Sequence, residues 1–216
     1  MKRILRWLQV NVFVAGPLFL LSGHWNDPWL WTYVAIVAAI TLYALVSISD
    51  DLTRERFTPP EPGADRLSLR AIRRIGAAHL VVGALDSGRF HWTTVPDGLR
   101  IAGLAGLALS FLLIAHAMRA NRFFSAVVRV QNDRGHHVVD RGPYAVVRHP
   151  GYAGMIPAIP FSALALGSWV SFAIALVYSA LIVRRVRFED RFLQQNLTGY
   201  AAYAQRVRYK LLPGGW

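Results

Sequence analysis

Two pairs of charged residues flank one apolar stretch of the chain, and both pairs carry groups suited to binding a ligand. The first pair is Arg148-His149, and the second is Glu189-Asp190. The apolar stretch between them is long enough for a helical hairpin that enters a membrane and returns to the side from which it started. The two pairs are therefore expected to meet at one membrane face, in an arrangement that can hold a charged cofactor.

The residues around the first pair predict an anion-binding site. Pro150 fits the first turn of a helix, so Arg148 and His149 come directly before a helix N-terminus. The free N–H groups and the dipole of such an end attract a carboxylate or a phosphate. Gly154 allows a ligand or a neighbouring helix to approach the backbone closely. The alternative is that Arg148 anchors the chain at the membrane surface and Tyr152 is an interfacial aromatic residue.

The second pair lies where a long helix is expected to leave the membrane. Arg185 and Glu189 are four positions apart and share a helix face, whereas Asp190 lies about 100° further round the helix. A carboxylate beside a cleft at a helix end can accept hydrogen bonds from the hydroxyl or ammonium groups of a cofactor. The alternative is a surface salt bridge between Arg185 and Glu189.

Long apolar runs indicate that membrane helices position these residues. The chain has 216 residues, is 54% hydrophobic and has a mean hydropathy of +0.33. Its candidate spans cover residues 8–23, 29–49, 75–88, 99–118, 152–167 and 169–183. The third and fifth runs are short for a perpendicular span, and the fifth contains Pro157 and Pro160, so tilted or kinked helices are expected there. The prediction is an all-α, polytopic membrane protein with five or six transmembrane helices.

The distribution of positive charge predicts the orientation. Six spans would place all but two of the 24 Lys and Arg residues on one side of the membrane, the exceptions being Arg89 and Arg100. This is the positive-inside bias, so both termini are expected in the cytoplasm, with the protein in a bacterial inner membrane. The net charge of +12 does not indicate nucleic-acid binding, because the arginines alternate with apolar spans and are expected to face anionic lipid headgroups.

The residue types present also exclude some classes of site. The chain has no Cys, which rules out disulfides, thiolate metal sites and a cysteine nucleophile. His136 and His137 are adjacent and no suitably spaced set of His or carboxylate residues accompanies them, so no metal site is predicted.

The chain is expected to have two parts of different character. Residues 1–118 hold the first four spans and a polar loop, residues 50–74, whose centre at 58–63 is too rich in Pro to be a continuous helix. Gly103 and Gly106 in the fourth span predict close helix packing. Residues 119–216 hold the hairpin, residues 151–187, flanked by two polar segments. We expect these segments to fold together into a C-terminal cytoplasmic cap that binds the cofactor.

Three motifs in the second part are similar to those of a known family. They are Arg148-His-Pro-x-Tyr152-x-Gly154 with the acidic pair one hairpin later, His136-x-x-Val-x-x-Gly-x-Tyr144, and Tyr200-x-x-Tyr203-x-x-Arg206-Val. Over residues 119–216 the chain resembles the isoprenylcysteine carboxyl methyltransferase family. It departs from that pattern at Asp190, where the family has a second Glu. Phospholipid N-methyltransferases and bacterial small-thiol methyltransferases have similar motifs, so the resemblance identifies the cofactor better than the methyl acceptor.

The resemblance implies methyl transfer from S-adenosylmethionine, a reaction that depends mainly on orientation. It implies that Arg185 positions the acceptor carboxylate, that Glu189 takes part in catalysis, and that residues 206–212 close over the pocket. It assigns cofactor binding to His136, Tyr144, Arg148, His149, Tyr152, Gly154, Glu189 and Arg206.

The acceptor stays open between the carboxylate of a prenylcysteine-like molecule, a small thiol and a lipid amine. A carboxylate is already ionised at neutral pH and needs no general base, whereas a thiol would benefit from a nearby cation. The apolar tail of a lipophilic acceptor is expected to enter sideways between the spans, while the cofactor enters from the cytoplasm.

Two other functions fit parts of the sequence. A membrane reductase of the sterol-reductase type would bind a nicotinamide dinucleotide, although such chains usually carry more spans. A transporter or assembly protein would place ionisable residues at the middle of the membrane, and the candidates for such positions are His79, Asp86 and His116.

Overall fold

The computed structural model describes residues 2–61 and 63–216. Its regular structure in these residues is helical, without β-strands. The α-helices, in chain order, are α1 (Lys2–Ser22), α2 (Pro28–Ser47), α3 (Asp50–Phe57), α4 (Arg66–Ala84), α5 (Asp97–Ala120), α6 (Pro150–Leu166), α7 (Trp169–Asn196) and α8 (Tyr200–Arg206).

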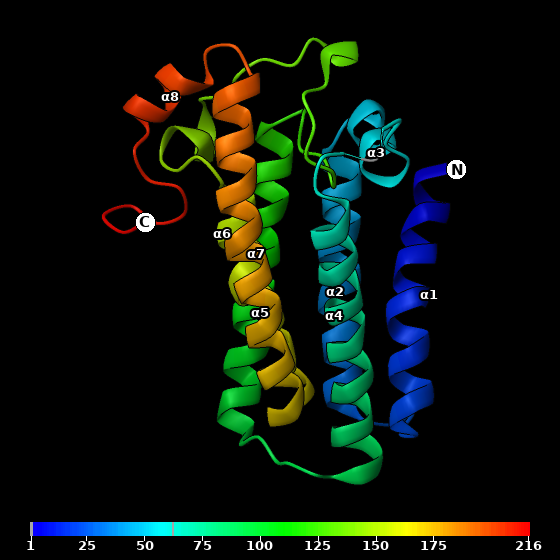
Figure 1. Cartoon of the computed structure of the whole chain (residues 1–216). Helices are drawn as coiled ribbons and strands as arrows, with labels where there is room; N and C mark the ends of the chain where they lie inside the picture. The colour runs from blue at the N-terminus through cyan, green and yellow to red at the C-terminus, as the bar shows by residue number, and fades with distance from the viewer. Residues whose placement is uncertain (1, 62) are drawn as a thin grey trace.

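The long helices run up and down beside one another, and the short helices α3 and α8 lie at one end of the bundle (Figure 1). The start of α1 and the C-terminal segment lie toward this same end. α6 packs between α5 and α7, while α4 contacts both α1 and α7. The connections at the other end, between α1 and α2, between α4 and α5 and between α6 and α7, leave the polar segments gathered at the first end.

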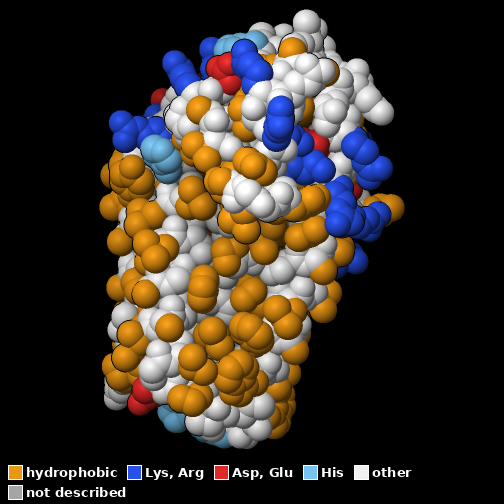
Figure 2. Space-filling model, turned by 90° about the vertical axis from the view of Figure 1, so that its left-hand side faces the viewer, with side chains coloured by type: hydrophobic (Ala, Val, Ile, Leu, Met, Phe, Trp, Pro, Cys, Tyr) orange, Lys and Arg blue, Asp and Glu red, His pale blue; other side chains and the backbone are white. Residues whose placement is uncertain are grey.

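The all-α membrane fold predicted from the sequence is confirmed. Four helices, α1, α2, α5 and α7, are long and apolar enough to cross a membrane, and α6 is a shorter apolar helix. α4 begins with arginine-rich turns and continues into a π-helical segment, Leu85–Phe90. Figure 2 shows one face of the molecule, with apolar side chains over most of the bundle and Lys and Arg side chains gathered at one end. The protein is therefore an integral membrane protein with one strongly basic end.

Glycines bring α5 and α6 into close contact, as Gly103 and Gly106 predict. A Cβ atom at Gly103 would lie 2.6 Å from the backbone nitrogen of Ala165, and one at Gly106 would lie 2.5 Å from the ring of Phe161. Gly154 on α6 faces α5 in the same way, since its Cβ would lie 2.7 Å from a backbone oxygen of α5. These contacts leave no room for a side chain at any of the three glycine positions.

A side chain of α7 compensates for a proline in α6. Pro160 has no N–H group, so the carbonyl of Ile156 loses its partner within the helix. The hydroxyl of Ser179 donates a hydrogen bond of 2.7 Å to this carbonyl. In an apolar bundle the bond matters, because no water replaces a missing donor there.

The loop between α3 and α4 contains the Pro-rich residues 58–61 and is not helical, as predicted. Gly63 has a φ of +70° and lies against Val127. The next amide, that of Ala64, donates a hydrogen bond of 2.8 Å to the carbonyl of Val128. The loop therefore supports the polar segment that follows α5.

Replacing Ser179 with Ala should destabilise the bundle by about 1–2 kcal/mol, because it leaves the Ile156 carbonyl without a donor. The measurement is thermal unfolding of purified protein in detergent. Thr32→Ala is the control, since the Thr32 hydroxyl is exposed and bonds only to a carbonyl of its own helix. Equal unfolding temperatures of the two variants would contradict the role given to Ser179.

Candidate active-site pocket

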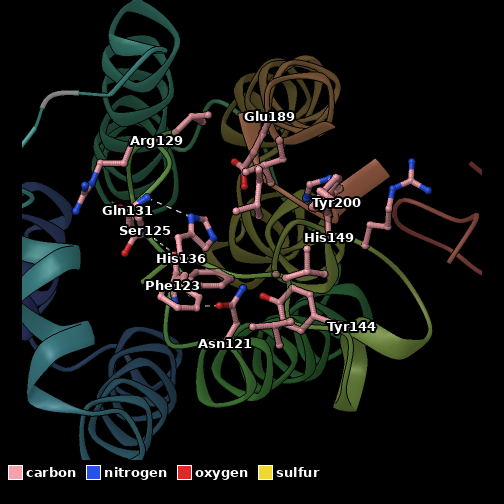
Figure 3. A pocket seen from close by; sticks show the side chains of 18 of the residues that line it. Asn121, Phe123, Ser125, Arg129, Gln131, His136, Tyr144, His149, Glu189 and Tyr200 are labelled. Atoms are coloured by element: carbon pink, nitrogen blue, oxygen red, sulfur yellow. Dashed lines mark hydrogen bonds between the residues drawn. The ribbon is translucent and has the colours of Figure 1, made fainter. Parts of the chain in front are cut away.

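A polar pocket lies at the basic end of the bundle, where the segment after α5 meets the start of α6, the end of α7 and α8 (Figure 3). It brings together most of the residues that the sequence predicts to bind a cofactor. Those that line it are His136, Tyr144, Arg148, His149, Tyr152 and Glu189.

Three other predicted residues lie outside the lining of this pocket. Arg206 is exposed and forms an ion pair of 2.6 Å with Asp140. Gly154 packs against α5. Arg185 is buried behind Tyr152 and reaches the pocket only through the hydroxyl of that residue.

The Arg148 guanidinium is fully engaged with protein groups. Its Nε and Nη2 donate to the two carboxylate oxygens of Asp190 at 2.8 and 3.0 Å. Its Nη1 donates to the carbonyls of Val207 and Arg208 at 2.7 and 2.8 Å. Although burial opposes the charge, these bonds to Asp190 raise the pKa of Arg148. The contacts therefore favour a structural role for Arg148 over the binding of a free anion.

Asp190 is the centre of this buried network, and only 2% of its side chain is exposed. Besides Arg148, it accepts hydrogen bonds from His149 at 3.1 Å, Tyr200 at 3.2 Å and Gln194 at 2.9 Å. Burial and the nearby Asp190 raise the pKa of Tyr200, which keeps the phenol protonated as a donor. The carboxylate whose role the sequence left open thus joins α7 to α8 and to the residues before α6.

Residues 206–212, which we call the C-terminal strip, are held by backbone hydrogen bonds. The amide of Arg148 donates to the carbonyl of Tyr209 at 3.0 Å, and that of His149 donates to the carbonyl of Lys210 at 2.9 Å. Residues 209–210 therefore lie beside the start of α6, next to the residues that line the pocket.

Glu189 presents a carboxylate to the pocket through a short chain of hydrogen bonds. The Tyr152 hydroxyl donates to Glu189 Oε2 at 2.6 Å, and Arg185 Nε donates to the same hydroxyl at 2.9 Å. Arg185 and Glu189 share a helix face as predicted, but Tyr152 connects them in place of a direct salt bridge. Among the described residues no donor bonds to Glu189 Oε1, so this oxygen is available to a ligand.

His136 contributes a neutral imidazole. Burial is the main cause that lowers the pKa of His136 to about 4. Its Nδ1 accepts a hydrogen bond of 3.2 Å from the backbone N–H of Gln131, so the proton of the neutral ring is on Nε2. Figure 3 shows the ring beside Phe123, with a distance of 4.5 Å between ring centroids.

The segment that carries His136 is fixed to α3 by a buried ion pair. Arg129 Nη2 lies 2.8 Å from Glu55 Oε2, and both side chains are almost completely buried. Ser125 donates to the other Glu55 oxygen at 2.7 Å. Sequence reasoning missed this pair, because no motif connects residues so far apart in the chain.

Sequence reasoning also missed lining residues from the first turns after α5. Asn121 accepts a hydrogen bond from the Phe123 amide at 2.8 Å, and the Gln131 side chain donates to the Phe123 carbonyl at 2.7 Å. An Asn directly after a long apolar helix is a signal for such a turn. It shows where the helix ends and gives no information about a pocket.

Two of the three ionisable residues named for a transporter, His79 and Asp86, are held by protein groups away from this pocket, and the third, His116, is exposed on α5. His79 Nε2 lies 2.9 Å from the Ser162 hydroxyl. Asp86 accepts hydrogen bonds from the hydroxyls of Thr93 and Ser168 at 2.5 and 2.6 Å.

Asp190→Asn should lower the free energy of unfolding by about 3 kcal/mol, because it leaves the buried charge of Arg148 uncompensated. The measurement is the thermal unfolding temperature in detergent. Asp140→Asn is the matched control, since the Asp140–Arg206 pair is exposed and such pairs contribute little. A change no larger than that of the control would show that Asp190 is not the centre of the cap.

His136 should make stability depend on pH. Because the folded state holds its pKa near 4, below the ordinary value of 6.5, the unfolded state binds more protons between these two pH values. The contribution of the neutral ring is complete above pH 6.5 and is lost as the pH falls toward 4. The difference in unfolding temperature between pH 7 and pH 4.5 should therefore be smaller in His136→Gln than in the wild type. In His137→Gln, where the replaced side chain is exposed, it should not change.

Several curated proteins resemble the chain. It is 27% identical over 119 residues to protein-S-isoprenylcysteine O-methyltransferase B of Arabidopsis thaliana, which covers 54% of the chain and 58% of the relative. It is 32% identical over 90 residues to the probable protein-S-isoprenylcysteine O-methyltransferase of Oryza sativa subsp. indica. This match covers 41% of the chain and 47% of the relative. It is 27% identical over 141 residues to the cobalt-zinc-cadmium resistance protein CzcN of Cupriavidus metallidurans. This match covers 62% of the chain and 61% of the relative.

The chain thus spans about half to three fifths of the length of these relatives. The model of the isoprenylcysteine carboxyl methyltransferase (ICMT) family matches residues 102–195. The matched region contains α6, nearly all of α7 and most of the residues that line the pocket. Over these residues the chain is similar to the isoprenylcysteine carboxyl methyltransferase family.

Proposed function

We propose that this protein is a membrane methyltransferase that uses S-adenosylmethionine and methylates a lipophilic or small acceptor. The observation that carries the proposal is the Glu189 carboxylate, which faces a pocket at the junction between the apolar bundle and its basic end. The names of the relatives support methyl transfer to a prenylcysteine-like carboxylate, with a thiol or a lipid amine as other acceptors.

The chemistry of the lining residues fits this cofactor. Glu189 is the one carboxylate among the described residues that line the pocket, and the rings of Phe123, Tyr144 and Tyr152 lie around the same space. A carboxylate with aromatic rings favours a cationic ligand. The N–H of His136 offers a donor to the polar parts of a nucleoside or an amino acid.

The residues of this chain would act mainly by orientation. When bound, S-adenosylmethionine supplies a methyl group already activated by the positive charge on sulfur. Glu189 would bind the ammonium or hydroxyl groups of the cofactor, and Tyr152 keeps that carboxylate in place through its hydrogen bond of 2.6 Å. Arg185 orients the Tyr152 hydroxyl from behind. Arg148, Asp190 and the C-terminal strip form a rigid wall that keeps bulk water away.

The pocket must open further for such a ligand. Its enclosed volume is about 90 Å³, whereas ligand sites typically measure about 300–1,000 Å³. The proposed orientation in a bacterial inner membrane places this end on the cytoplasmic side. The cofactor is made in the cytoplasm, and membrane proteins carry more Lys and Arg on that side.

Glu189→Gln should weaken the binding of S-adenosylhomocysteine at least about tenfold, because a hydrogen bond to a charged group is lost. The measurement is isothermal titration of the purified protein, with Asp140→Asn as the control. NADPH, titrated into the same preparation, should not bind. Unchanged binding of S-adenosylhomocysteine in Glu189→Gln would contradict the site, and saturable binding of NADPH alone would favour a reductase.

A further inference from the structure

A second, apolar cavity lies beside the polar pocket, between α1, α2 and α5 and below α3. We call it the apolar chamber; its volume is about 300 Å³. Most of its wall is hydrocarbon and aromatic, including Val10, Ile40, Leu45, Phe111, Ile114 and Met118. Arg56 of α3 is the one charged side chain among the described residues that line it.

Arg56 has no carboxylate partner for its charge among the described residues. Its Nη1 atom is buried and makes no hydrogen bond, and no described carboxylate lies within 4.0 Å of its guanidinium. The adjacent carboxylate, Glu55, is already bound by Arg129. The Arg56 side chain as a whole is half-buried. A cation partly withdrawn from water without a carboxylate partner is unfavourable, so an anionic group from outside the described residues would be stabilised beside it.

Arg56 lies at the junction of the chamber and the polar pocket. Its Cζ atom is 5.1 Å from the centre of the Phe124 ring, and Phe124 lines the pocket. Met155 lines both cavities. Burial lowers the pKa of Arg56 to about 10, opposed by Tyr152 and Tyr144, two residues of the pocket wall. The side chain stays charged at neutral pH and faces the side on which the methyl donor would bind.

The fully buried arginines at this end are compensated. Arg148 is paired with Asp190, and Arg129 with Glu55. Arg185, to which the family resemblance assigns the acceptor carboxylate, donates to Tyr152 and to the Ala126 carbonyl. Its remaining Nη1 lies 3.7 Å from Asp65. Arg185 thus holds the pocket wall together, while Arg56 is free to bind an anion.

We propose that Arg56 binds the carboxylate of the methyl acceptor, whose apolar tail occupies the chamber. The inference rests on the proposed methyltransferase function and chooses among its acceptors. It favours an anionic amphiphile over a lipid amine, since a cationic head would be repelled by Arg56. Arg56 is therefore the residue that determines specificity for the acceptor head group.

The charge of the acceptor changes during such a reaction. A bond forms between the methyl carbon and a carboxylate oxygen, while the carbon–sulfur bond breaks and leaves its electron pair on sulfur. The carboxylate becomes a neutral ester and the sulfonium becomes a neutral thioether. The ester no longer pairs with Arg56, so the product is held less tightly than the acceptor.

The test measures binding of radiolabelled N-acetyl-S-dodecylcysteine to protein in lipid nanodiscs, without a methyl donor. The neutral carboxamide of the same compound and dodecylamine are the comparison probes. The wild type should bind the carboxylate about 10- to 100-fold more tightly than the carboxamide, as expected for a charged hydrogen bond in an apolar site. Arg56→Gln should remove this preference, and Arg56→Lys should restore part of it.

The matched control is Arg54→Gln, which removes an exposed arginine from the same helix. Arg56→Gln should unfold at the same or a higher temperature than the wild type, because it removes a half-buried charge that has no carboxylate partner. A lower unfolding temperature would instead indicate a structural role for Arg56. Equal binding of carboxylate and carboxamide by the wild type, or equal losses in Arg56→Gln and Arg54→Gln, would overturn the proposal. Because no donor is present, a failure of S-adenosylhomocysteine to bind would count only against the proposed function.

Discussion

The polar end of this protein depends on one buried ion pair, between Arg148 and Asp190. Two charges removed from water are stable only when each satisfies the other and their remaining hydrogen-bonding groups also find partners. Here the backbone carbonyls of residues 207 and 208 complete the shell of Arg148, and His149, Gln194 and Tyr200 complete that of Asp190. The pair thereby fixes the start of α6, the end of α7, α8 and the C-terminal strip relative to one another.

The arginines of this end differ in what surrounds them, although they look alike in the sequence. Arg148 and Arg129 hold chain segments together through buried carboxylates. Arg185 orients a tyrosine of the pocket wall. Arg206 lies on the surface, and Arg56 borders an apolar chamber without a partner among the described residues. Such an unpaired charge lowers stability, a cost that proteins accept mainly at sites of function.

Much of the architecture follows from local patterns. Apolar runs predict the long helices, because each must bury its backbone polar groups within itself. The Pro-rich stretch at 58–61 cannot be helical, and Gly103 and Gly106 predict the close contact of α5 with α6. The pocket residues that precede or begin α6 are recognisable because a proline and an adjacent basic pair mark a helix start. Asn121 and Glu55 were missed, since their roles depend on residues brought near only by the fold.

The sequence by itself determined the helical membrane fold, the basic end and six of the residues that line the pocket, since these follow from hydropathy, charge distribution and short motifs. Only the tertiary structure decided which charges are paired. In it Arg148 pairs with Asp190, and Tyr152 lies between Arg185 and Glu189. Gly154 packs against α5, and Arg206 is exposed to solvent. The physical reason is that an ion pair depends on distances of a few ångströms between helices, whereas spacing along a chain reports only which face of its own helix a residue occupies.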